Sequence, residues 1–277
     1  MSWTIAVEHV TEYRYTEPAQ VSYNEIRMTP QENGEQLVLE TGLEISPPVN
    51  LFPYRDYWDT MVQRFDIRHP HDRLRIVARS VVKTPAGHEV PAVVSPKWDE
   101  DEFAEQLAPT ALTALPADKR VQAMISELIA SNTPASAVAK AAKFVNRSLR
   151  YQPGSTAVST TAAETWQIKK GVCQDFSHLC IALLRAAGIP ARYVSGYYYP
   201  LAEGEIEQEV AGESHAWVEA WVGWWMQIDP TNLNFDPKRY IVIGHGRDYN
   251  DVAPFVGIYS GSGESEMAVN VILKRLA

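Results

Sequence analysis

The chain has 277 residues, of which 45% are hydrophobic and 21% are charged, and its formal net charge is −9. This composition is typical of a folded globular protein, and the length suits one large or two medium domains. The negative charge argues against a nucleic-acid partner, and no apolar run approaches the roughly 20 residues that span a bilayer.

The first 95 residues have the pattern of antiparallel β-structure. Trp3, Ile5 and Val7 occupy alternate positions, as the buried side of a half-exposed strand does. The same character recurs in later segments, at 37–39, 61–67 and 73–82, with proline and Asn-Gly turn signals between them. We therefore expect roughly five to seven short strands in a β-sandwich over residues 1–95.

Residues 96–116 differ in composition from the segments on either side and predict a linker. The acidic run 99–102 is interpreted as a solvated face, and Pro109 and Pro116 follow it. A domain boundary in this region separates the β-domain from a second domain over 117–277.

From residue 117 the apolar period becomes helical. Predicted helices cover 117–131, a segment that starts at Thr133-Pro134, a segment from Thr161 to Lys170, and a segment from Cys173 to Gly188. Strands are then expected at 192–199, 215–221, 224–229, 240–243 and 267–273. Helices followed by an antiparallel sheet make an α+β domain.

Cys173 is the candidate nucleophile. It follows a glycine turn at Gly171 and occupies the first turn of a helix, where unpaired backbone N–H groups favour a thiolate and can bind an oxyanion. Cys180 is the other cysteine in the chain, and it lies in the apolar stripe of the same helix, as a core residue does. Two turns of helix, roughly 10 Å, separate the two thiols, which is too far for a disulfide and favours a reducing, cytoplasmic setting.

His215 and Asp229 are the candidate base and its orienting carboxylate. They lie on two strands joined by a turn at Val222-Gly223, and a three-residue loop there would pair 215 with 229. Asp229 would then accept from one imidazole nitrogen and leave the other for Cys173.

A zinc site is the alternative for these side chains, with Cys173, His178, Cys180 and His215 as ligands. Residues five apart on a helix are rotated by about 140°, so His178 would face away from both cysteines. We expect no metal, and no organic cofactor, because the chain has no glycine-rich phosphate loop.

At these positions the chain resembles the transglutaminase-like superfamily, which includes papain-like cysteine peptidases, and more narrowly the bacterial transglutaminase-like proteins with an N-terminal β-domain. The resemblance covers nearly the whole chain, and its motifs are Gly171-Val172-Cys173-Gln174-Asp175-Phe176, Gly188-Ile189-Pro190-Ala191-Arg192-Tyr193-Val194-Ser195-Gly196-Tyr197, Ser214-His215-Ala216-Trp217, Asp229-Pro230-Thr231-Asn232, and Gly246-Arg247-Asp248-Tyr249 with Asp251-Val252 and Pro254. It implies a papain-like fold with Cys173 as nucleophile, His215 as general base and acid, and Asp229 as the orienting carboxylate.

Several further residues are predicted to support the site. The Cys173 backbone N–H is the first candidate oxyanion donor, and Tyr151 or the Gln174 side chain is the second. Asp175 and Trp217 are expected beside the triad. Arg247 and Asp248 are expected to form an ion pair, which either shapes the cleft floor or stabilises the fold. Four acidic residues precede His215 and are either a cleft rim that steers basic substrates or a solvated loop: Glu203, Glu205, Glu207 and Glu209.

The expected function is cysteine-dependent hydrolysis of an amide in a peptide or protein substrate, through a thioester acyl-enzyme. Animal transglutaminases, as the resemblance implies, carry Gln and Trp beside the cysteine, whereas this chain has Val172 and Gln174. Hydrolysis is therefore preferred over joining of the acyl group to an amine. Two alternatives stay open: an acyltransferase that uses the same triad, and a catalytically idle binding module. The sequence does not name the substrate or the oligomeric state.

Overall fold

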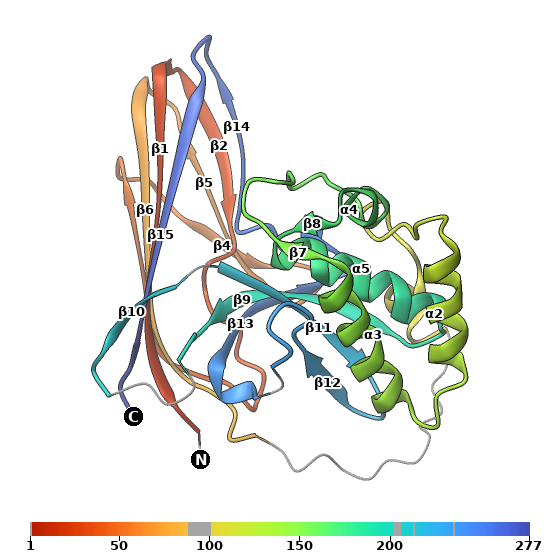
Figure 1. The fold of residues 1–277 in the computed structure, drawn as a ribbon. Helices are drawn as coiled ribbons and strands as arrows, with labels where there is room; N and C mark the ends of the chain where they lie inside the picture. Colours follow the sequence, from red (N-terminus) through yellow and green to blue (C-terminus); the bar gives the residue numbers. More distant parts are fainter. Residues whose placement is uncertain (1, 88–100, 202–205, 213, 235) are drawn as a thin grey trace.

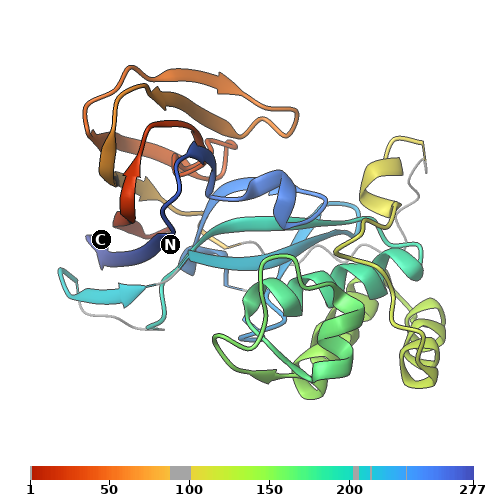
Figure 2. The same cartoon turned by 90° about the horizontal axis from the view of Figure 1, so that it is seen from above.

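The structure is a computed structural model that describes residues 2–87, 101–201, 206–212, 214–234 and 236–277. A tall β-sandwich stands beside a unit in which helices cover one face of a central sheet (Figure 1). Figure 2 shows this central sheet between the sandwich and the helices. The expected α+β class, with an antiparallel β-domain at the N-terminus, is confirmed.

The sandwich contains the early strands of the chain. One sheet includes β1 (Thr4–Ala19), β3 (Leu37–Ser46) and β6 (His71–Lys83), and the other includes β2 (Val21–Ile26), β4 (Phe52–Arg55) and β5 (Met61–Ile67). Alternate residues of these strands point inward, because side chains along a strand alternate between its two faces. The inward residues of both sheets meet in one apolar core, which includes Ile26, Phe65, Ile67, Leu74 and Ile76.

The last strands of the chain also belong to the sandwich. β15 (Ser265–Arg275) pairs with β1 along its length, and β14 (Phe255–Ser260) pairs with β2. β10 (Glu209–Gly212) pairs with the end of β15. The expectation that the strand near 267–273 continues the C-terminal sheet is therefore wrong, because β15 pairs with β1 and not with a strand of that sheet. Its buried Val271 and Leu273 pack in the apolar cluster between the two sheets.

The four predicted helices are confirmed as α2 (Lys119–Ile129), α3 (Pro134–Ser148), α4 (Ala162–Ile168) and α5 (Cys173–Ala186). Thr133 caps α3 and Thr161 forms a capping box with Glu164 at α4, as the sequence predicts. Two short helices were not predicted, α1 (Ala104–Leu107) and α6 (Tyr249–Val252). Part of the expected linker, residues 96–100, lies outside the described residues, and α1 occupies part of the remainder.

The central sheet has the strand order β12-β11-β9-β13. Its strands are β9 (Ala191–Tyr198), β11 (Ser214–Trp221), β12 (Trp225–Ile228) and β13 (Tyr240–Gly246), with a short 3-10 helix at Pro237–Arg239 before β13. Ala216, Val218 and Ala220 of β11 pack against the helices in the largest apolar cluster. The parallel pair β7 (Arg150–Tyr151) and β8 (Lys170–Gly171) lies just before α5.

The helix α5 is the centre of this unit. Nearly all of its residues from Gln174 to Arg185 are buried, since α2, α3 and α4 cover one side and the sheet covers the other. A helix that is enclosed on all sides holds its first residue in a fixed position relative to the neighbouring strand ends. Among the described residues, no helix is long and apolar enough to cross a membrane.

Candidate active site

Cys173 is the first residue of α5, as the sequence predicts. Its side chain is half-buried, whereas Cys180 is fully buried in the core below it. Burial raises the pKa of the Cys180 thiol well above its usual value, so this thiol stays protonated and unreactive. The two cysteines of one helix thus have the contrasting environments that the sequence predicts.

Gly171 is needed for close approach rather than for a left-handed turn. The left-handed residue at this corner is Lys169, with φ of 60°, at the end of α4. A Cβ at Gly171 would lie 2.6 Å from the Cβ of Asp175, which is closer than atoms can pack. The carboxylate of Asp175 accepts from the backbone N–H of Val172 at 2.7 Å and from the hydroxyls of Thr156 and Thr165, at 2.7 and 3.2 Å. Asp175 therefore fixes the chain that carries Cys173 into the helix.

His215 and Asp229 are in direct contact. Nε2 of His215 lies 2.7 Å from Oδ2 of Asp229. The predicted register is wrong, because Trp221 pairs with Trp225 and Val218 pairs with Ile228 around a loop at 222–224. Continuing this register would set Asp229 opposite position 217, two residues from the predicted partner. A shift of two residues keeps a side chain on the same face of the sheet, so the contact still forms diagonally.

The electrostatics of the pair depend on both neighbours of the imidazole. Burial alone would lower the pKa of His215, but hydrogen bonds with Asp229 and Cys173, and the charges of both groups, raise that pKa to about 10. Burial likewise would raise the pKa of Asp229, yet the hydrogen bond from His215 and its charge hold the pKa of this carboxyl below its usual value. At neutral pH the imidazole of His215 is therefore protonated, between Asp229 and Cys173.

Further donors, which the sequence did not predict, complete the surroundings of Asp229. Its Oδ2 also accepts from the hydroxyl of Tyr240 at 2.9 Å and from Nδ2 of Asn232 at 2.8 Å. Its Oδ1 accepts from the backbone N–H groups of Thr231 and Asn232 at 2.8 and 3.1 Å. A buried carboxylate with this many donors is held in one orientation. Asn232 lies in the motif Asp229-Pro230-Thr231-Asn232, whereas Tyr240 has no local signal.

Cys173 and His215 open onto one cavity of about 420 Å³, which we call the Cys173 cleft. Its walls come from several parts of the chain: the segment 151–158, the start of α5, strands β9 and β11 with Gly212, the segment 249–254, and Val269 with Val271 of β15. The β-sandwich thus supplies one wall of the cleft. A larger cavity of about 770 Å³ lies elsewhere and is lined by Trp221, Trp224 and Trp225, without Cys173 or His215.

Three other predicted residues are near the site in different ways. Tyr151 is exposed and lines the Cys173 cleft, which keeps its predicted role as an oxyanion donor open. Gln174 also lines the cleft, but its side-chain amide donates to the carbonyl of Val158 at 3.0 Å. Trp217 is fully buried, and its ring stacks near His215 at a centroid distance of 6.2 Å.

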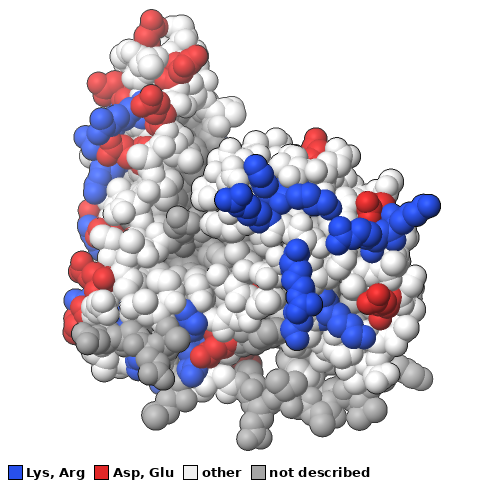
Figure 3. Space-filling view, in the orientation of Figure 1, with Lys and Arg blue, Asp and Glu red and all other residues white. Residues whose placement is uncertain are grey.

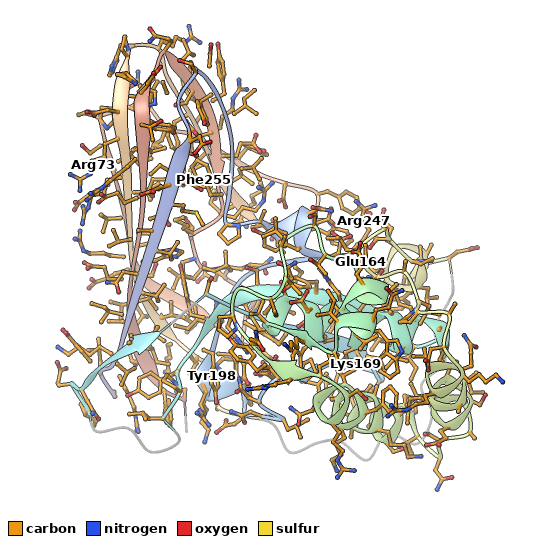
Figure 4. All side chains as sticks on the ribbon, turned by 45° about the horizontal axis from the view of Figure 1, so that its top comes forward. Arg73, Glu164, Lys169, Tyr198, Arg247 and Phe255 are labelled. Atoms are coloured by element: carbon orange, nitrogen blue, oxygen red, sulfur yellow. The ribbon has the colours of Figure 1, made fainter. Side chains whose placement is uncertain are left out.

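The predicted pair between Arg247 and Asp248 does not form. Arg247 pairs instead with Asp251 through bonds of 2.9 and 3.0 Å, while Asp248 caps α6 by accepting from the backbone N–H of Asn250. Neither residue lines the Cys173 cleft. Figure 4 shows Arg247 well apart from Tyr198, whose ring lies 5.3 Å from that of His215. The physical reason is local: a helix N-cap turns the Asp248 side chain toward its own backbone.

Two of the four acidic residues before His215, Glu203 and Glu205, lie outside the described residues. Glu207 pairs with Lys274 at 2.6 Å, and Glu209 lies beside Lys274 in the pairing of β10 with β15. Neither residue lines the Cys173 cleft. Figure 3 shows Lys and Arg side chains over the helical layer and a largely uncharged hollow between that layer and the sandwich.

His178 has a structural partner. It is fully buried, and its Nε2 accepts from the backbone N–H of Tyr249 at 3.2 Å. Burial lowers the pKa of His178 to about 3, so the ring is neutral. Within the part of the chain that the structure describes, no three His, Cys, Asp or Glu side chains gather as metal ligands would.

Comparison with known proteins adds an independent line of evidence. The family model of the transglutaminase-like superfamily matches residues 123–230, and that of the bacterial transglutaminase-like N-terminal region matches residues 5–83. An uncharacterized protein of Mycobacterium leprae is 42% identical over 282 residues, which cover 99% of this chain and 100% of that protein.

Two further matches concern proteins with a stated chemistry. A protein-glutamine gamma-glutamyltransferase of Pseudomonas aeruginosa is 30% identical over 126 residues, which cover 40% of this chain and 18% of that protein. A crystal structure from Cytophaga hutchinsonii, described as a candidate cysteine protease, matches 100% of this chain and 92% of its own with a TM-score of 0.81 and 23% identity. At that identity the likeness concerns the fold.

Proposed function

Since this chain belongs to the transglutaminase-like superfamily, with the bacterial transglutaminase-like N-terminal region, we propose that it is a cysteine-dependent amide hydrolase acting on peptides or proteins. The observation that carries the proposal is the line of contacts from Cys173 through His215 to Asp229. The carboxylate and the thiol group together raise the pKa of His215 to about 10 against the effect of burial. An imidazolium beside a cysteine stabilises the thiolate, which is the reactive form.

In the proposed reaction the Cys173 thiolate attacks the amide carbonyl and forms the C–S bond. His215 gives its proton to the leaving nitrogen as the C–N bond breaks, so an amine departs and a thioester remains. The neutral imidazole then removes a proton from water, which attacks the thioester. The C–S bond breaks, a carboxylic acid leaves, and the thiolate and imidazolium are restored. Asp229 keeps the imidazole in orientation in both steps.

The negative oxygen of each tetrahedral intermediate needs hydrogen-bond donors. The backbone N–H of Cys173, at the start of α5, is the first proposed donor, because the first N–H groups of a helix have no acceptor within it. Tyr151 is the second proposed donor, since it lines the same cleft. Gln174 is less suited, because its amide already donates to Val158.

A second candidate function is acyl transfer to an amine, which the name of the Pseudomonas aeruginosa relative favours. The same thioester would then react with an amine instead of water. The residues beside the nucleophile, Val172 and Gln174, argue for hydrolysis, as the sequence analysis concluded. An idle binding module has no physical need for a buried carboxylate that orients an imidazole toward a thiol. The two unpaired cysteines fit a reducing compartment, so a cytoplasmic location is part of the proposal.

Trapping of the acyl-enzyme tests the proposal. The protein is incubated with an activated acyl ester, quenched in acid, digested and analysed by mass spectrometry. The acyl group is expected on the peptide that contains residue 173, and the Cys173→Ala variant should carry none. Cys180→Ala is the matched control, because it removes the buried thiol of the same helix. Acylation that survives in Cys173→Ala and disappears in Cys180→Ala would overturn the assignment.

A further inference from the structure

One edge of β15 is only half occupied. β1 pairs with β15 over residues 265–275, whereas β10 pairs with its other edge over residues 271–274. In the described part of the chain, no strand pairs with that other edge over residues 265–270. Native proteins usually protect such an edge with lysine, proline or a covering segment, because it offers unpaired backbone groups to another chain.

The direction of the backbone groups follows from one hydrogen bond. The carbonyl of Arg275 accepts from the N–H of Glu207, on the side of β15 that β10 occupies. In an antiparallel strand the N–H and C=O of a residue point to the same side, and successive residues alternate. The pairing of β1 with β15 has no register shift, so Met267 and Val269 also point their backbone groups toward this open side. Ala268 points its groups toward β1.

The side chains along the open edge are largely apolar and exposed. Met267 and Val269 are 59% and 47% exposed, although they lie on the same face as the buried Val271 and Leu273. Val269 and Val271 line the Cys173 cleft, together with Gly212 at the end of β10. A second cavity of about 500 Å³ continues beside Ser265, along β14. The open edge therefore leads directly away from the cleft, through the uncharged hollow in Figure 3.

We infer that residues 265–270 of β15 bind the substrate polypeptide as an added antiparallel strand, in line with β10. This inference rests on the function proposed above and concerns how the substrate reaches the same site. β10 demonstrates that this edge accepts an antiparallel strand, and its last residue, Gly212, stands at the cleft. β10 runs from Lys274 toward Val271 along the edge of β15. A substrate strand that continues in this direction along residues 265–270 begins at the cleft, with its N-terminal end there. The segment on β15 is therefore the part of the substrate that follows the reacting carbonyl.

The backbone of the substrate would supply most of the affinity, and its alternate side chains would contact Met267 and Val269. The substrate class is thus an extended polypeptide with apolar residues at alternate positions after the reacting carbonyl. The edge of β14 is a less suitable platform. Its exposed residues Val256 and Ile258 line the second cavity, and neither lines the Cys173 cleft.

Amide hydrogen exchange on the full-length Cys173→Ala protein tests the inference without turnover. The probe is a synthetic peptide of alternating threonine and valine with one glutamine at its N-terminal end. On addition of the peptide, the amides of Met267 and Val269 are expected to gain protection. The amide of Ala268 is the internal control, since its bond to β1 exists in both states. A matched peptide with N-methylated alternate residues lacks the donors and should give no protection.

Affinity measurements on variants separate backbone from side-chain effects. Met267→Pro removes one outward N–H and is tolerated best on an edge strand, so it should weaken binding of the peptide about tenfold, as loss of one hydrogen bond predicts. Met267→Ala keeps the N–H and should have a smaller effect. Leu39→Pro is the control, because Leu39 is an exposed residue at an irregularity of β3, on the opposite edge of the same sheet.

The outcomes distinguish the inference from the function on which it rests. If the peptide binds or is hydrolysed without protection of Met267 and Val269, or protects β14 instead, the edge is not the substrate platform. Dimerisation that protects these amides without peptide would also overturn it, since the occupant would be a second copy. Absence of Cys173-dependent acylation by the small ester would instead contradict the proposed function. The exchange experiment would still show whether the peptide binds to β15.

Discussion

The hydroxyl of Tyr240 donates to Oδ2 of Asp229 at 2.9 Å, the same oxygen that lies 2.7 Å from Nε2 of His215. Tyr240 is the first residue of β13, and β9 separates that strand from β11, which carries His215. One oxygen atom therefore joins three strands of the central sheet at the site. Tyr240 also lines the large cavity of tryptophan residues, which His215 does not line. Tyr240 therefore lies between that cavity and the site.

Tyr240→Phe should lower turnover about tenfold. Removal of one donor to the buried carboxylate loosens the contact that orients His215, and this should raise the activation free energy by roughly 1.4 kcal/mol. The expected change is in kcat rather than KM, since Tyr240 does not line the Cys173 cleft. Steady-state hydrolysis of a peptide amide measures both constants. Tyr199→Phe is the matched control: its buried hydroxyl has no hydrogen-bond partner in the described structure, so activity should not change. Equal losses in the two variants would argue for a general packing effect.

Asp229→Asn should lower turnover more steeply, by about 10²–10⁴-fold. The side chain keeps its shape, but an amide at this position offers a donor where His215 needs an acceptor. Circular dichroism should show an intact fold, because the backbone N–H groups of Thr231 and Asn232 still find the remaining carbonyl oxygen. A variant with full turnover would mean that Asp229 only shapes its turn and takes no part in the reaction.

The pH profile of turnover reports the protonation of His215. Burial lowers the pKa of His215, and the bonds and charges of Asp229 and Cys173 raise it to about 10. The proposed general acid must carry a proton, and it does so below its pKa. Hydrolysis should therefore persist in mild alkali and fall as the pH rises through about 10. In Asp229→Asn the remaining activity should fall at a lower pH, since one of the groups that raise the pKa is gone. A high-pH limb at the same position in both proteins would contradict this coupling.

Gly171→Ala should disturb the start of α5. The new Cβ would lie 2.7 Å from Oδ2 of Asp175, and this carboxylate holds the N–H of Val172. We expect a loss of about 1–3 kcal/mol in the free energy of unfolding, as overpacking gives, together with lower turnover. Denaturant unfolding and steady-state kinetics measure the two effects. Gly42→Ala is the control, because a Cβ at Gly42 would meet no atom within 4 Å. Equal stability of both variants would exclude the close approach.

The sequence predicted those parts of the site that depend on local signals. The first residue of α5 follows from the glycine and the apolar period, and the contact between His215 and Asp229 survives a wrong register because strand faces repeat every two residues. Tyr240 was missed because its contact with Asp229 depends on the order of strands in the sheet. The pairing of β15 with β1 was missed for the same reason, since the two strands are at opposite ends of the chain. Pairing over such distances leaves no local pattern.

The tryptophan residues near the β11–β12 hairpin bear on the choice between water and an amine. A thioester reacts with an amine in preference to water only where a site binds the amine and excludes water, and such sites are usually apolar and aromatic. Trp217 is buried, and Trp221, Trp224 and Trp225 line the large cavity rather than the Cys173 cleft. None of these four rings therefore forms an amine channel at the nucleophile.

Turnover of a glutamine peptide should consequently release acid even when millimolar lysine analogue is present. The assay follows formation of the glutamate product and incorporation of a fluorescent primary amine in the same reaction, with Cys173→Ala as the blank, because ammonia leaves in both reactions. The ratio of incorporation to hydrolysis is expected to stay low and to rise only in proportion to the amine concentration, as an unassisted collision predicts. A ratio that saturates with the amine, at a level above hydrolysis, would instead demonstrate a bound acceptor and favour acyl transfer as the natural reaction.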